Sequence, residues 1–127
     1  MKSFLLTLIL ALGVSGFAAE FADISKDDLT KAIASKKVVV IDVNGSESFK
    51  AGHIPGAIDF AAKKGELASL LPADKSTLVV AYCGGPACGA WQAGAEAVAA
   101  LGFTNVQHFK GGISGWKDSG AAVETVH

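Results

Sequence analysis

Hydrophobic and polar positions along the chain fall into two alternating patterns. Continuous apolar runs rich in β-branched residues are typical of strands buried on both faces, and two such runs lie within residues 36–43 and 77–82. Residues 105–109 are predicted as a third strand. The segments around and between these runs have helical character; they are residues 26–35, 65–71, 90–101 and 113–118. The pattern therefore predicts three strands separated by helices.

Local signals mark several ends of these elements. Ser25 followed by Asp28 resembles a capping box at the start of the first helix. Gly102 follows the helix at 90–101 and is typical of a helix C-terminus. We expect turns at residues 53–57, which contain a proline and a glycine, and at the pair Gly111-Gly112.

Strands that alternate with helices favour an α/β fold with a parallel sheet. The chain has 127 residues, of which 50% are hydrophobic, and no internal repeat or low-complexity tract divides it. This length and composition fit one globular domain with one core. We place that domain at residues 20–127.

Residues 1–19 have the pattern of a secretory signal peptide. Lys2 supplies a positive start, residues 4–12 are apolar apart from Thr7, and small residues lie around position 18. The apolar run is shorter than the roughly 20 residues that cross a bilayer. We therefore expect cleavage near Ala18 or Ala19, no stable membrane insertion afterwards, and a bacterial periplasmic or secreted protein in which a disulfide can persist.

The charge pattern excludes some partners. The formal net charge is -1, and no block of like charge could serve as a nucleic-acid-binding tail, so we expect no nucleic-acid partner. All 11 basic residues are lysines, so the chain has no guanidinium with which to hold an anion.

The candidate chemistry lies between the second predicted strand and the helix after it. Both cysteines of the chain, Cys83 and Cys88, stand in this connection. In parallel sheets, ligands bind where strands end and helices begin. We expect an anion-binding nest here, in which backbone N–H groups and a helix N-terminus face a thiolate. The nest comprises Gly84, Gly85, Pro86, Ala87, Cys88 and Gly89. Such a site lowers the pKa of a cysteine and stabilises developing negative charge, although Cys83 read alone also fits a small buried apolar residue.

Three segments resemble the rhodanese-like family of sulfurtransferases. They are VVVIDVNGSESFKAGHIPGAIDF from Val38, LVVAYCGGPACGAW from Leu78 and LGFTNVQHFKGGISGWKDSG from Leu101, in the order and spacing of that family. The resemblance implies a three-layer fold with a central five-stranded parallel sheet flanked by helices. It also implies that Cys83 forms a persulfide at the first position of a six-residue loop that ends at Cys88. A loop one residue longer is typical of related phosphatases and arsenate reductases.

The resemblance further implies a reaction. The Cys83 thiolate attacks the outer sulfur of a small sulfur-containing anion such as thiosulfate or a polysulfide, and the persulfide then gives that sulfur to cyanide or to a thiol acceptor. This is two-step covalent catalysis, and it needs no metal or organic cofactor.

Four positions depart from the family pattern. Cys88 replaces the usual basic or hydroxyl side chain at the end of the loop, and Gly84 replaces a frequent basic residue at its second position. Pro86 removes one N–H donor. Asn44 takes the place of a frequent arginine after the first predicted strand. Donor recognition must then rest on backbone dipoles or a lysine from elsewhere, so we do not expect fast turnover of thiosulfate.

Cys88 also keeps other interpretations open. The two cysteines could form a reversible disulfide in a thiol–disulfide redox protein, or in a sulfur carrier that resolves its own persulfide, if the loop holds their Cα atoms within about 7 Å. They could instead form a structural staple, or form a zinc site with His53 and His108. The domain could also be a non-catalytic rhodanese module that binds a partner or a small anion.

Two further residues support the predicted site. Asp42 ends a strand near the same edge of the sheet, and we expect it to order loop backbone. His53 belongs to a turn, and we interpret it as a structural hydrogen-bonding residue rather than a general base. Trp91 and Trp116 are assigned to core packing.

Overall fold

A computed structural model describes residues 20–127 of the chain, so the expected signal peptide lies outside the described residues. Five parallel strands form one sheet in the order β1-β5-β4-β2-β3. The strands are β1 (Ala22–Asp23), β2 (Val38–Asp42), β3 (Ile58–Asp59), β4 (Leu78–Tyr82) and β5 (Val106–His108). The structure confirms the α/β class and the five-stranded parallel sheet.

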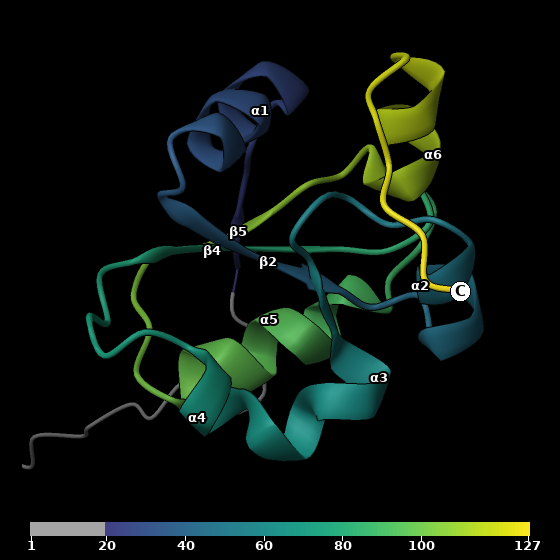
Figure 1. The fold of residues 1–127 in the computed structure, drawn as a ribbon. Helices are drawn as coiled ribbons and strands as arrows, with labels where there is room; N and C mark the ends of the chain where they lie inside the picture. The colour runs from purple at the N-terminus through teal and green to yellow at the C-terminus, as the bar shows by residue number, and fades with distance from the viewer. Residues whose placement is uncertain (1–19) are drawn as a thin grey trace, which may run out of the picture.

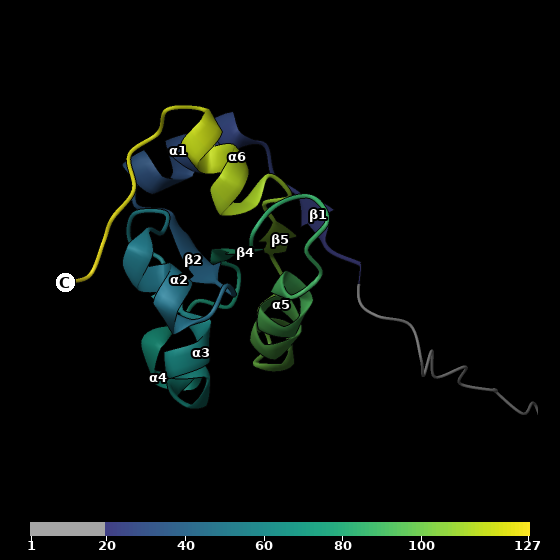
Figure 2. The same ribbon diagram turned by 90° about the vertical axis from the view of Figure 1, so that its right-hand side faces the viewer.

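The helices cover both faces of this sheet. Figure 1 shows α1 (Lys26–Ala34) and α6 (Gly112–Asp118) on one side of the strands. The opposite side carries α5 (Trp91–Ala100) with the short helices α3 (Phe60–Lys63) and α4 (Leu67–Leu70), while α2 (Ser46–Ala51) follows β2. Figure 2 shows the same layers from the side. No helix among residues 20–127 has the length and apolar character needed to cross a membrane.

The two longest strands, β2 and β4, are neighbours and are aligned over their whole length. Val38 lies opposite Leu78, and Asp42 lies opposite Tyr82, so both strands end at the same edge. Their apolar runs are buried on both faces, as expected for the centre of a parallel sheet. One core on the α5 side contains Ile41, Val79, Ala81, Ala95 and Val98, and the other, on the α1 and α6 side, contains Leu29, Val40, Val80, Tyr82 and Trp116.

Two local contacts fix helices in these layers. Ser25 caps α1, and its hydroxyl accepts a hydrogen bond from the N–H of Asp28 at 3.1 Å, which confirms the predicted N-cap. In α5, a Cβ added at Gly94 would lie only 2.8 Å from a methyl group of Val43 and 3.3 Å from one of Ile41. The missing side chain lets α5 pack closely against β2.

The start predicted for the helix at residues 65–71 is wrong. Instead, α3 begins at Phe60 because Asp59 caps it, with its carboxylate accepting from the N–H of Ala62 at 3.5 Å. A 3-10 turn, η1 (Lys64–Glu66), joins α3 to α4. The predicted stop is correct, since Leu71, before Pro72, has extended backbone with ψ 149°.

Candidate active site

Cys83 lies directly after β4, at the carboxyl edge of the sheet. Its residue surface is only 1% exposed. The carbonyl of Cys83 accepts a hydrogen bond from the N–H of Ile113 at 2.9 Å, and the carbonyl of Gly84 accepts one from the N–H of Ser114 at 3.0 Å. The first turn of α6 therefore holds the start of the loop in place.

Close approach of α6 to the loop depends on Gly112. Its φ of +61° lies in the left-handed region that favours glycine. A Cβ at this position would lie 2.5 Å from the carbonyl oxygen of Cys83 and 2.6 Å from both the carbonyl carbon of Gly84 and the nitrogen of Gly85. The Gly111-Gly112 pair was predicted as a turn, and the structure shows that Gly112 also makes room for the loop.

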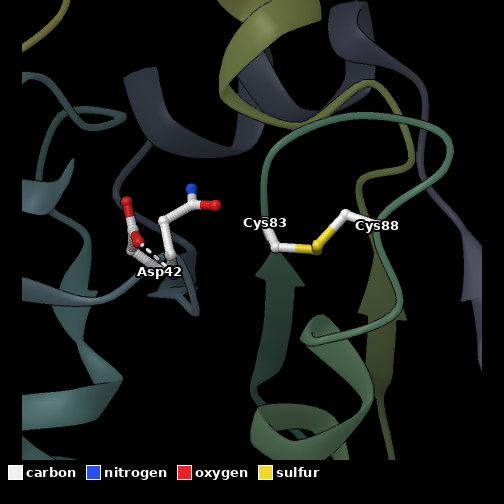
Figure 3. Close-up of a disulfide and its surroundings, with 4 residues drawn as sticks. Asp42, Cys83 and Cys88 are labelled. Carbon is white, nitrogen blue, oxygen red and sulfur yellow. Dashed lines mark hydrogen bonds between the residues drawn. A yellow bond between two sulfur atoms is a disulfide. The ribbon is translucent and has the colours of Figure 1, made fainter.

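Cys83 and Cys88 are joined by a disulfide, with their Cα atoms 6.2 Å apart. Figure 3 shows the bond spanning the loop from the end of β4 to its far limb. The loop is thus compact enough for the two sulfurs to bond. In this oxidised state neither sulfur is a thiolate, so the loop must be reduced before Cys83 acts as a nucleophile.

The loop also leaves backbone donors unpaired. The N–H of Cys88 donates to the carbonyl of Gly85 at 3.0 Å, forming a tight turn around Pro86. Within residues 20–127, the structure shows no acceptor for the N–H groups of Gly84, Gly85 and Ala87. Gly89 has no such acceptor either, and it precedes Ala90, the N-cap of α5. Backbone N–H groups of this kind are the donors from which an anion-binding nest is built.

Asp42 forms a buried polar network next to the loop. Its residue surface is 0% exposed, its carboxylate accepts from the hydroxyl of Tyr82, and it also accepts from the N–H of Asn44 at 2.9 Å. The same hydroxyl accepts from the N–H of Ile54 at 3.0 Å. Burial raises the pKa of Asp42 above its ordinary value, although the bonds from Tyr82 and Asn44 oppose this shift. Asp42 orders the backbone that carries Asn44, and it lies on the neighbouring strand, apart from the disulfide (Figure 3).

The Asn44 side chain lies beside the loop. A Cβ at Gly84 would be 3.8 Å from its carbonyl oxygen Oδ1. Its amide nitrogen Nδ2 is buried and has no hydrogen-bond partner among the described residues. A neutral amide therefore borders Gly84.

His53 makes its contacts away from the cysteine loop, with Phe49 and Glu124. Its Nδ1 donates to the carbonyl of Phe49 at 2.7 Å, and its ring stacks on the Phe49 ring with the centroids 3.7 Å apart. Its backbone pairs with Glu124 through two hydrogen bonds of 2.9 Å. His53 thus anchors the C-terminal segment, and it is not joined to the loop by any hydrogen bond within residues 20–127.

A stacked pair that sequence reasoning did not find lies at the end of the loop. Trp91, the first residue of α5, stacks on His108 at the end of β5 with centroids 3.6 Å apart. Asp23 Oδ1 lies 3.3 Å from His108 Nδ1, and burial lowers the pKa of His108 while Asp23 opposes that shift. No spacing in the sequence marks such a pair, because its members come from a helix start and a strand end.

The zinc site considered for Cys83, Cys88, His53 and His108 is not formed among residues 20–127. Among residues 20–127, no three His, Cys, Asp or Glu side chains are grouped so that they could hold a metal ion. Cys83 and Cys88 instead bond to each other, and His53 and His108 have the separate contacts described above.

The family model of the rhodanese-like domain matches residues 25–119. This match covers most of the chain, including β2, β4, the cysteine loop and α6. The chain therefore belongs to the rhodanese-like domain family.

Individual relatives agree with this assignment. The thiosulfate sulfurtransferase GlpE of Shewanella oneidensis is 29% identical over 106 residues, which cover 81% of this chain and 99% of that protein. The BH2092 protein of Bacillus halodurans has 29% identity and a TM-score of 0.59, covering 82% of this chain and 77% of that one. A rhodanese-related protein from Thermoplasma volcanium shares the fold, with a TM-score of 0.62 at 24% identity over 82% of this chain and 98% of that one. The similarity to thiosulfate sulfurtransferases is distant.

Proposed function

We propose that the reduced protein is a sulfurtransferase that carries sulfane sulfur as a persulfide on Cys83. The observation that carries this proposal is the position of Cys83, which is anchored after the central strand β4. It begins a loop in which several N–H groups have no acceptor among residues 20–127. Membership of the rhodanese-like family and similarity to a thiosulfate sulfurtransferase support it.

The reaction has two steps. The Cys83 thiolate attacks the outer sulfur of thiosulfate, the S–S bond of the donor breaks, and sulfite leaves with the bonding electron pair. The outer sulfur of the persulfide then passes to cyanide or to a thiol, which restores the Cys83 thiolate. The N–H groups of Gly84, Gly85 and Ala87 stabilise the anionic donor and the persulfide.

Mass spectrometry of matched variants tests this function. The Cys88→Ser variant has one cysteine and cannot close the loop disulfide, so after a pulse of thiosulfate or polysulfide its intact mass should rise by one sulfur atom. The Cys83→Ser variant should gain none, because a hydroxyl forms no S–S bond. If neither variant gains sulfur and the wild type releases no sulfite, the proposal is wrong and a binding module is favoured.

The disulfide favours a second candidate, a thiol–disulfide redox protein that uses Cys83 and Cys88. Such a protein would exchange electrons with other thiols without accepting sulfur. Its reduced wild type would lose two hydrogens on oxidation by a disulfide and would release no sulfite from thiosulfate. Release of sulfite from thiosulfate therefore distinguishes the sulfurtransferase from the redox protein.

We also propose that the domain acts outside the cytoplasm. The signal pattern of residues 1–19 supports this, and a loop disulfide is compatible with an oxidising compartment. N-terminal sequencing of protein recovered from an exporting bacterial host should begin at Ala19 or Glu20. Full-length chain confined to the cytoplasm would contradict export.

A further inference from the structure

The loop places a second thiol next to the proposed nucleophile. Cys83 and Cys88 are the chain's two cysteines, and the structure bonds one to the other. The Cys88 sulfur therefore reaches Cys83 Sγ itself, the inner sulfur of any persulfide that forms there. This contact needs no rearrangement of the fold.

The two ends of the loop differ in how firmly they are held. Cys83 is buried, and the backbone around it is bonded to Ile113 and Ser114 of α6. Cys88 is half-buried, and its neighbours Ala87 and Gly89 are exposed. The Cys88 side is therefore the one that can move away to admit a donor and the one that an external thiol can attack.

We propose that the protein is a dithiol-dependent sulfane-sulfur reductase, in which Cys88 resolves the Cys83 persulfide and releases sulfide. This inference rests on the proposed persulfide function. The donor is a sulfane-sulfur anion such as thiosulfate, and the reductant is a dithiol, either a small molecule or a protein with a pair of exposed thiols. The disulfide seen in the structure is the oxidised product of one turnover.

The steps balance in atoms and electrons. After sulfite has left, the Cys88 thiolate attacks Cys83 Sγ, the bond from Cys83 Sγ to the outer sulfur breaks, and hydrosulfide leaves with the electron pair. The outer sulfur is reduced to sulfide, and the two cysteine sulfurs are oxidised to the disulfide. A dithiol then reduces this bond through a mixed disulfide at Cys88. The net reaction converts thiosulfate and a dithiol into sulfite, hydrogen sulfide and a disulfide.

Two features favour attack by Cys88 over attack by an external thiol. The first is that the attacking and attacked sulfurs belong to one short loop, so the step is intramolecular. The second is that Cys88 precedes the N-terminus of α5, whose N-cap is Ala90 and whose positive dipole end favours a thiolate. Cyanide or another acceptor must compete with this internal thiol.

A single-turnover experiment without external thiol tests the inference, since any added thiol could itself remove the persulfide sulfur. Wild-type protein is reduced, desalted without oxygen and mixed with thiosulfate. Sulfite and sulfide are quantified per chain, and the protein is alkylated and weighed. We expect one sulfite and one sulfide per chain, together with the loss of two hydrogens from the protein.

The Cys88→Ala variant should release one sulfite, no sulfide, and gain one sulfur atom. Cys88→Ser provides a second variant if alanine disturbs the loop. The sulfite and sulfide released by the wild type test the inference even if both variants fail to fold. Sulfite release with a retained persulfide in the wild type would overturn the inference and leave the sulfurtransferase proposal intact. Equal sulfide release by the Cys88 variants would also overturn it. If the wild type releases no sulfite and the Cys88 variants gain no sulfur from thiosulfate or polysulfide, both proposals are refuted.

Discussion

At the scale of single residues, the site combines a disulfide-bonded cysteine pair with a buried carboxyl group. The disulfide joins Cys83 to Cys88, and Asp42, on the neighbouring strand, is fully buried. Tyr82 and Asn44 donate hydrogen bonds to Asp42. Because its raised pKa reflects the cost of burying a charge, Asp42 links the stability of the site to pH.

We predict that Asp42→Asn flattens the pH dependence of stability. The pKa of Asp42 is raised above 3.8 in the folded protein, so the folded state holds this proton more tightly than the unfolded state. The resulting contribution to stability is fully present below pH 3.8 and is lost as the pH rises through the folded pKa. Urea unfolding across this range should show the wild type losing free energy of unfolding relative to the variant as pH rises.

The asparagine also alters the hydrogen bonds to Tyr82 and Asn44, which shifts the free energy of unfolding at every pH. The informative quantity is therefore the change of the wild-type-minus-variant difference with pH. A difference that stays constant between about pH 3 and pH 8 would show that Asp42 does not titrate with a raised pKa.

At the scale of elements, α6 and the loop form one unit. The N–H groups of Ile113 and Ser114 bond to the loop, and Gly112 allows the close approach. The helix thus serves the site through its backbone rather than through a side chain.

Substitution of Gly112 by alanine should disrupt this unit. The added Cβ would meet loop backbone at 2.5 to 2.6 Å and would also require a left-handed φ. We expect the free energy of unfolding to fall by about 2 kcal/mol or more. Gly115→Ala is the matched control in the same helix, because its Cβ would meet nothing within 4 Å.

Chemical denaturation of the two variants provides the comparison. The control should be unchanged or more stable by roughly 0.5–1 kcal/mol, since alanine favours a helix over glycine. Equal stability of the two variants would show that the loop yields to the added methyl group without cost.

The elements also show what the sequence could predict. The long strands β2 and β4 were found because their continuous β-branched runs mark central positions, and α1 was found through its cap at Ser25. The edge strands β1 and β3 have two residues each, which is too short for any periodicity. The total of five strands was therefore predicted only from the family resemblance. The loop cysteines were identified from the sequence, whereas the stacking of Trp91 on His108 depends on tertiary packing.

At the scale of the whole molecule, the fold has two apolar cores that do not depend on the disulfide. The bond closes a short loop, with a sequence separation of 5, at one edge of the sheet. The cores lie between the sheet and its two helical layers. The protein should therefore remain folded when the loop is reduced, as the proposed reaction requires.

Reduction should lower the free energy of unfolding by about 2 kcal/mol, the loop-closure contribution of so short a crosslink. Urea unfolding with and without dithiothreitol measures this difference, and circular dichroism should show the same secondary structure in both states. Cys88→Ala is the control, since its stability should not respond to the reductant. Unfolding of the wild type on reduction would mean that the disulfide is a structural staple.

The hydrogen bonds from Ile113 and Ser114 to the loop carry a further consequence for measurement. Amide protons that are bonded to a carbonyl exchange with solvent deuterons only when that bond opens. The exchange rates of these two amides therefore record how often the loop start separates from α6, at positions where no sulfur atom is modified. A comparison of oxidised, reduced and persulfidated protein would follow the opening of the site through the proposed reaction without a chemical label.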